Sequence, residues 1–151
     1  MGRSFHWMDR PETLRRLDTI IEPEGAVALL GDHHPDVPDN AWQPAWREVL
    51  ERYAPEGRSR GCGPGWVRHE AVLLDSPFSR LETIALVERR QIDTQTLVRR
   101  ALSMSSLSAA GAGQRLDELT RDLSAAIAPF ASDGAITEVV ESYALLAWRL
   151  Q

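Results

Sequence analysis

The side chains of this sequence that could do chemistry fall into a few short groups. They are Ser4-Phe5-His6-Trp7, His33-His34 flanked by Asp32 and Asp36, the single cysteine Cys62, and the serines Ser103 and Ser105. Adjacent histidines in an extended loop point apart, and histidine pairs that bind a metal from a helix use other spacings. We therefore predict a solvated loop at His33-His34 and no metal site. Cys62 lies in a glycine-rich stretch and is expected to be incidental.

Two pairs of arginines form a second kind of candidate. We expect Arg89-Arg90 and Arg99-Arg100 to be solvated or ion-paired. The alternative that one of them binds an acidic substrate stays open. Ser103 and Ser105 lie at the end of an expected helix and suit the capping of its C-terminal end as well as a ligand contact.

Composition excludes several classes of protein. The chain has 151 residues, 43% of them hydrophobic and 26% charged, with a net charge of −5. This length suits one domain, which we assign to residues 1–151. The sequence has no basic stripe of the kind that indicates nucleic-acid binding. It also has no apolar run that approaches the roughly 20 residues that span a bilayer. With no signal-peptide pattern and one cysteine, we expect a cytoplasmic protein.

The elements that must position these residues follow from caps and periodicity. Asp9, Pro11 and Glu12 open a helix whose apolar residues continue to Ile21, and Pro23 with Gly25 ends it. Further helices are expected at 42–53, 69–74, 94–104 and 116–127, and strands at 26–30, 81–92 and 136–149. The order of helices and strands predicts an α/β fold with three strands.

The first strand carries the strongest tertiary signal. Ala26–Leu30 is an unbroken apolar run, which predicts burial on both faces, as in a parallel sheet. A strand of that kind normally has a neighbour on each side, yet no strand is predicted before it. We expect its outer edge to recruit another strand, which favours a homodimer or a domain-swapped assembly.

Several segments together resemble a known family. Ser4–Arg10, the following helix, the turn Pro23-Glu24-Gly25 and the strand after it resemble the middle of class I S-adenosylmethionine-dependent methyltransferases, where an aromatic-His-Trp segment ends the fourth strand. The later part agrees through Ser76-Pro77-Phe78, the Glu88-Arg89-Arg90 strand end, Ser103 with Ser105, and the terminal Ala147-Trp148-Arg149. The resemblance covers nearly all of residues 2–151 and is to the type 11-like, trans-aconitate methyltransferase-like branch.

This resemblance implies a partial Rossmann-like sheet, with three strands corresponding to the family's strands 5, 6 and 7, the last antiparallel, and flanking helices. It implies S-adenosylmethionine as cofactor and a small-molecule methyl acceptor. Ser4 and Phe5 would border the cofactor, and His6, Trp7, Ser103 and Ser105 would border the substrate. His6 is the candidate base, although methyl transfer needs mainly alignment of the reactants. Trp7 packing against the first helix is the structural alternative.

The family's glycine-rich cofactor turn has no counterpart in this sequence. Gly61-Cys62-Gly63-Pro64-Gly65 follows no predicted strand, and Pro64 lacks a backbone donor, so we do not expect it to hold the cofactor. We expect the chain to be the C-terminal half of a methyltransferase, through an upstream start of translation or loss of the front of the gene. It would then be one half of a split enzyme with an N-terminal-half partner, or a non-catalytic, self-associating remnant.

Overall fold

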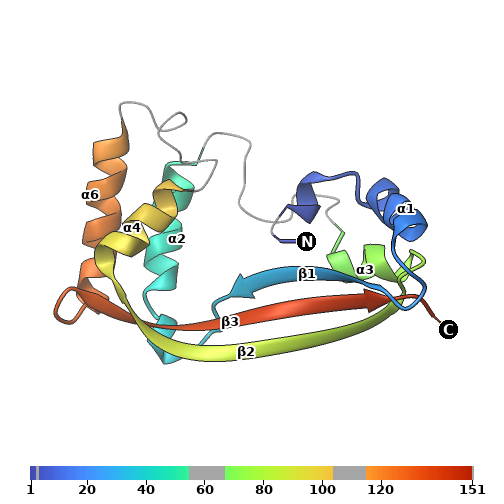
Figure 1. The fold of residues 1–151 in the computed structure, drawn as a ribbon. Helices are drawn as coiled ribbons and strands as arrows, with labels where there is room; N and C mark the ends of the chain where they lie inside the picture. The colour runs from blue at the N-terminus through green and yellow to red at the C-terminus, as the bar shows by residue number, and fades with distance from the viewer. Residues whose placement is uncertain (3, 55–66, 104–114, 151) are drawn as a thin grey trace. The chain divides into compact units, whose positions relative to one another are not determined.

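The computed structural model describes residues 1–2, 4–54, 67–103 and 115–150. In chain order the elements are a 3-10 helix η1 (Phe5–Trp7), α1 (Arg10–Ile20), β1 (Ala26–His33), η2 (Pro38–Asn40), α2 (Gln43–Arg52), α3 (His69–Leu74), β2 (Arg80–Asp93), α4 (Thr94–Leu102), α6 (Leu116–Ile127), η4 (Ala128–Phe130) and β3 (Ala135–Trp148) (Figure 1). Every helix and strand predicted from the sequence is present within the described residues. The described part of the helix predicted at 94–104 ends at Leu102.

In the part of the chain that the structure describes, three strands form the sheet, in the order β1-β3-β2. Strand β3 runs antiparallel to β1, with Ala26 opposite Trp148 at one end of the ladder and His33 opposite Glu141 at the other. Strands β2 and β3 run in opposite directions (Figure 1). The sheet confirms the predicted α/β class with three strands, an antiparallel last strand and flanking helices.

The chain packs as two compact units, and the long strands β2 and β3 contribute to both. Unit 1 consists of Met1–His33, Pro64–Val87 and Glu141–Gln151, and unit 2 of His34–Gly63 and Glu88–Val140. In unit 1, helices α1 and α3 lie over one face of the sheet (Figure 1). Its core is made by Phe5, Leu14, Val27, Leu29, Leu73, Phe78, Leu145 and Ala147.

Unit 2 has its own core, built from amphipathic helices. The apolar faces of α2, α4 and α6 meet, because each places its large apolar residues three or four positions apart. The buried residues are Trp42, Trp46, Val49, Leu50, Ile92, Leu97, Val98, Ala101, Leu119, Leu123, Ile127 and Ile136. The indole rings of Trp42 and Trp46 meet edge to face, with 5.9 Å between their centres.

Local sequence sets the ends of the helices. The carboxylate of Asp9 accepts a hydrogen bond from the backbone N–H of Glu12 and so caps α1, as predicted. Asp93 caps α4 in the same way through the N–H of Thr96. This hydrogen bond, together with that from the Thr96 hydroxyl, lowers the pKa of Asp93.

The prediction that Ala26–Leu30 is buried on both faces is wrong. Val27 and Leu29 are buried, whereas Leu30 exposes 55% of its surface. Alternate residues of a strand face opposite sides of the sheet. In unit 1, α1 and α3 cover only the side that Val27 and Leu29 face (Figure 1).

The outer edge of β1 pairs with the backbone of Met1. The N–H of Leu30 donates to the Met1 carbonyl at 2.8 Å, and the Met1 amino group donates to the Ala28 carbonyl. The two backbone hydrogen bonds of Met1 thus go to the residues on either side of Leu29. This is the hydrogen-bond pattern of a parallel strand pair. The edge of β1 that faces away from β3 therefore has the geometry to accept a parallel strand.

Candidate functional site

The segment Ser4–Trp7 forms a tight turn that sorts its side chains. The N–H of Trp7 donates to the Ser4 carbonyl and the N–H of Met8 to the Phe5 carbonyl, at 3.0 and 3.2 Å. In a 3-10 helix successive side chains point about 120° apart. Phe5 is therefore directed into the core of unit 1, and Ser4, His6 and Trp7 are exposed.

His6 and Trp7 present adjacent rings on the surface of unit 1. Their ring centres lie 4.7 Å apart, and Trp7 exposes 76% of its surface. An indole this exposed is not packed against the first helix, so the structural alternative for Trp7 is wrong. Together the rings offer an imidazole beside a flat aromatic surface.

Helix α3 supports this turn through a residue that the sequence analysis missed. The ring of His69 lies 5.2 Å from the ring of Phe5. The Arg10 guanidinium donates to the Val67 carbonyl at 2.6 Å and lies 3.3 Å from Nδ1 of His69. Because a guanidinium can only donate, Nδ1 accepts and the ring proton is on Nε2. Only the position of His69 at the start of a predicted helix was visible in the sequence.

The pKa of His69 reflects these surroundings. Burial lowers it most, and the positive charge of Arg10 and the neighbouring His6 lower it further, against a smaller opposing effect of Glu70. His69 is therefore neutral near pH 7. With Nδ1 occupied and Nε2 protonated, it is suited to hold Phe5 and Arg10 in place rather than to take up a proton.

The other predicted site residues lie in unit 2. The Ser103 hydroxyl donates to the Arg100 carbonyl at 2.8 Å, which is a capping interaction at the end of α4. Ser105 lies outside the described residues, as do Cys62 and the glycine stretch 61–65. The described structure thus gives Ser103 a local structural role and leaves the role of Ser105 as a prediction.

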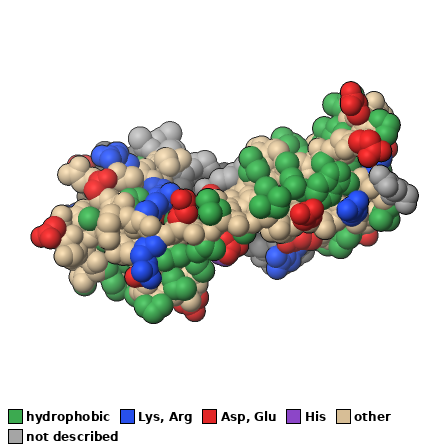
Figure 2. Space-filling model, turned by 60° about the horizontal axis from the view of Figure 1, so that its bottom comes forward, with side chains coloured by type: hydrophobic (Ala, Val, Ile, Leu, Met, Phe, Trp, Pro, Cys, Tyr) green, Lys and Arg blue, Asp and Glu red, His purple; other side chains and the backbone are tan. Residues whose placement is uncertain are grey.

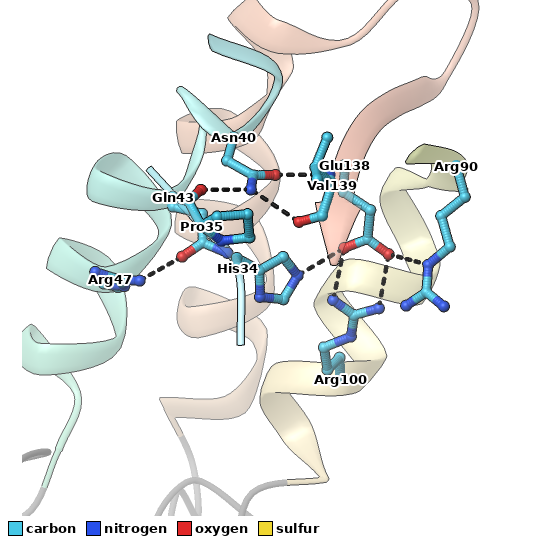
Figure 3. Close-up of polar contacts among 9 residues, drawn as sticks. All are labelled: His34, Pro35, Asn40, Gln43, Arg47, Arg90, Arg100, Glu138 and Val139. Atoms are coloured by element: carbon cyan, nitrogen blue, oxygen red, sulfur yellow. Dashed lines mark hydrogen bonds and ion pairs between the residues drawn. The ribbon is translucent and has the colours of Figure 1, made fainter. Parts of the chain in front are cut away.

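The densest charged cluster lies in unit 2 around Glu138, which is fully buried on β3 (Figure 3). Its carboxylate accepts from Arg90 Nε at 2.8 Å and from the two terminal nitrogens of Arg100 at 3.0 and 3.2 Å. Nε2 of His34 lies 2.9 Å from the same carboxylate. One acidic group therefore joins the segment after β1, strand β2, helix α4 and strand β3.

Charge and burial act in opposite directions on Glu138. Burial alone would raise the pKa of its carboxyl, since it disfavours the charged form. Hydrogen bonds from His34, Arg100 and Arg90, with the charge of Arg100, outweigh burial and hold the pKa well below its ordinary value. Glu138 is therefore ionised throughout the physiological range.

The predicted solvated loop at His33-His34 is wrong for His34. Its side chain is only 15% exposed, bound to Glu138 and edge-on to the ring of Trp42 at 5.6 Å. His33 lies at the end of β1 and is half exposed, with Nδ1 3.8 Å from the carboxylate of Glu141. Among the residues that the structure describes, no group of three or more His, Cys, Asp or Glu could hold a metal ion.

The arginines are ion-paired, as predicted. Arg90 and Arg100 bind Glu138, Arg89 binds Asp39 at 2.9 Å, and Arg99 donates to the Thr96 hydroxyl at 2.6 Å and lies 3.9 Å from Asp93.

Asn40 fixes the loop beside this cluster. Its amide nitrogen donates to the carbonyls of Pro35 and Val139, each at 2.8 Å, and its oxygen accepts from the Val139 N–H at 2.9 Å (Figure 3). The neighbouring Gln43 accepts from Arg47 at 2.5 Å. These contacts make the surroundings of Glu138 a scaffold in which the side chains of His34, Asn40, Arg90 and Arg100 bind other groups of the same unit.

The described residues do not by themselves fit an S-adenosylmethionine site. Such a site needs glycines that let the backbone approach the cofactor after a strand. Gly25 lies in the turn before β1, where a Cβ would be 2.5 Å from the Ile21 side chain, and Gly31 lies within β1 against the ring of Tyr143. Of the predicted cofactor contacts, Ser4 is exposed and Phe5 is in the core.

Comparison with known proteins gives a likeness of fold. No protein-family model matches the sequence, and no curated protein matches it. The chain is similar to a solved structure from Anaeromyxobacter dehalogenans that is named provisionally as a type II methyltransferase. The TM-score is 0.56 at 18% sequence identity, over 98% of this chain and 62% of that chain. The likeness shows a shared fold, and this chain spans less than two thirds of the length of its neighbour.

No helix of the described residues is both long enough and apolar enough to cross a membrane.

Proposed function

We propose that this chain is the substrate-side portion of an S-adenosylmethionine-dependent methyltransferase acting on a small molecule. The observation that carries the proposal is the shared fold with a structure named as a methyltransferase, over 98% of this chain and 62% of the other. In the proposal, the glycine-rich cofactor-binding turn lies in the part of that fold that this chain does not span.

The edge of β1 supports this division of roles. The Met1 backbone bonds to Ala28 and Leu30 follow the pattern of a parallel strand. In the proposal, the cofactor-binding portion adds a strand parallel to β1 at this edge. That portion belongs either to the same polypeptide or to a separate subunit of a split enzyme.

The turn before α1 is the proposed acceptor-binding surface. Trp7 offers a flat, exposed indole on which an apolar or unsaturated acceptor can stack. His6 stands beside it, with its ring centre 4.7 Å away, and is the candidate to accept a proton from the acceptor. Phe5, Arg10 and His69 position the turn through ring packing and hydrogen bonds.

The second candidate function is a non-catalytic α/β protein that acts by self-association. The observation in its favour is the set of large apolar side chains exposed on β2, including Ile84, Leu86 and Val87. Self-association and catalysis are compatible, so the two functions are separated by methyl transfer and not by oligomeric state.

Methyl transfer to a panel of small acceptors tests the proposal, with this chain supplied together with the polypeptide that carries the glycine-rich turn. Trp7→Ala is expected to raise the KM for the acceptor, and His6→Gln to lower kcat by roughly 100-fold. Ile20→Ala is the matched control, because Ile20 is 75% exposed on α1 of the same unit. Full activity of both the Trp7 and His6 variants would place the acceptor site elsewhere.

A further inference from the structure

Strand β2 is an edge strand with an unusual surface. Among the described residues it has a strand beside it on one side only, since the sheet order is β1-β3-β2. Ile84, Leu86 and Val87 expose 56%, 59% and 57% of their surfaces. Natural sheets protect such edges with charge, proline or a covering element, because an exposed apolar edge pairs with other strands. No proline and no charge interrupts residues 83–87.

Ile84 and Leu86 belong to the sheet face of unit 1 that α1 and α3 do not cover. Arg80 lies over the ring of Trp148, which is opposite Ala26, whereas Leu81 packs against the core. Alternation along β2 therefore places Ile84 and Leu86 on the side of Trp148 and Leu30. Figure 2 shows hydrophobic side chains gathered on this face.

We propose that β2 pairs with β2 of a second copy of this chain, antiparallel about a two-fold axis at Ile84. A two-fold interface uses the same surface patch on both subunits, so the patch must be complementary to itself. Side chains directly opposite each other in antiparallel strands lie on the same face, about 4.5–5.5 Å apart at Cβ. With the axis at Ile84, the two Ile84 side chains meet, and Leu81 is opposite Val87 of the partner subunit.

Charge distinguishes this register from those with the axis at Ala85 or Leu86. With the axis at Ile84, Arg80 is opposite Glu88 of the partner subunit, twice per dimer. Moving the axis to Ala85 places Glu82 opposite Glu88 and Arg80 opposite Arg90, which are repulsive pairs.

Moving the axis one residue further, to Leu86, leaves Arg80 opposite the apolar Ile92. It also places Glu82 opposite Arg90, whose guanidinium already donates to Glu138. The Ile84 register places Glu82 opposite Leu86 of the partner subunit, but it is the one of the three that pairs Arg80 with a carboxylate and leaves the Glu138 cluster intact.

The pairing goes beyond the proposed catalytic function and does not depend on it. Dimerisation through β2 does not involve the opposite edge of the sheet, at β1, where the proposed function places a parallel strand. Both surfaces can be occupied at once, because β3 lies between them in the sheet.

Sedimentation velocity measures the association directly and needs no cofactor. The wild-type chain is expected to be a dimer at micromolar concentration. Ile84→Lys places two ammonium groups next to each other at the axis and removes the contact between the two isoleucine side chains, so self-association should weaken by roughly 100-fold or more. Leu74→Lys, at a leucine of α3 with 55% exposure, is the matched control and should leave the dimer unchanged. A monomeric wild type, or a dimer that survives Ile84→Lys, overturns the proposal.

Cysteine cross-linking tests the register, in a Cys62→Ser background that removes the single native thiol. Ile84→Cys places two thiols across the axis, at a separation that a disulfide can bridge. It should form covalent dimers faster than Leu86→Cys or the surface control Leu74→Cys. Faster cross-linking of Leu86→Cys would contradict the Ile84 register, and equal rates for all three would contradict strand pairing. Circular dichroism of each variant verifies that it is folded.

Discussion

Replacing Glu138 by Gln is the most informative test of unit 2, because the fully buried carboxylate holds three cationic or polar partners from separate segments. The substitution keeps the shape and removes the charge. Removing one partner of a buried ion pair costs about 3–5 kcal/mol, since the remaining charge is left without compensation. The Arg90 and Arg100 side chains are 50% and 29% exposed and can recover some hydration, so we expect the lower end, about 3 kcal/mol.

Urea denaturation followed by tryptophan fluorescence measures this loss, because Trp42 and Trp46 lie in the core of the same unit. Arg89→Gln is the matched control, since Arg89 is 73% exposed in its pair with Asp39. It should change the free energy of unfolding by less than about 1 kcal/mol. A loss below about 1 kcal/mol in Glu138→Gln would refute the assignment of Glu138 as the centre of the scaffold.

The pH dependence supplies an independent check. The pKa of Glu138 is lower in the folded chain than its ordinary value of 4.5. The unfolded chain therefore binds the proton more readily, and the stabilisation is present above about pH 4.5 and is lost as the pH falls toward the folded pKa. The difference in stability between wild type and Glu138→Gln should shrink between pH 6 and pH 3. A constant difference over that range would contradict the electrostatic explanation.

Three further outcomes are expected. Asn40→Ala removes three hydrogen bonds, two of them to the backbone of Val139. Urea denaturation should therefore show a loss of about 2–3 kcal/mol in the free energy of unfolding. No measurable loss would mean that water replaces the amide. Arg149→Lys should destabilise unit 1 by about 1–2 kcal/mol in thermal unfolding, because lysine cannot reproduce the guanidinium contacts to Asp18 and to the carbonyl of Ile21. Arg121→Lys, on the surface of α6, is the matched control. NMR titration should give His69 a midpoint below 6.5, and the midpoint should rise in Arg10→Gln. The free energy of unfolding should fall as the pH drops through about 6.5, because the imidazole of the unfolded chain takes up a proton first. A midpoint above 6.5 would contradict the assigned surroundings of His69.

Local signals predicted the elements because each acts within a few residues. Asp9 with Glu12 is a capping pattern, and the Asp9 carboxylate makes the expected bond. The apolar run Ala26–Leu30 predicted a strand correctly, but its burial depends on what covers each face. That depends on where α1 and α3 pack, which the run itself does not encode.

The charged cluster was out of reach for the opposite reason. His34 and Glu138 are 104 residues apart in the sequence, and no residue next to either of them indicates that the two side chains meet. A signal was nevertheless present. Glu138 directly precedes the apolar pair Val139-Val140 in a predicted strand, and a carboxylate in such a position needs a cationic partner when it is buried. His69 was missed for a similar reason, since its contacts with Phe5 and Arg10 join segments about 60 residues apart.

Calorimetric titration with S-adenosylmethionine tests the central claim most directly, carried out on this chain alone and on the chain combined with the polypeptide that carries the glycine-rich turn. The account predicts no saturable binding to the chain alone and saturable binding to the combination. Tight binding to the chain alone, or none to a folded combination, would contradict the assignment of this chain as the substrate-side portion of a methyltransferase.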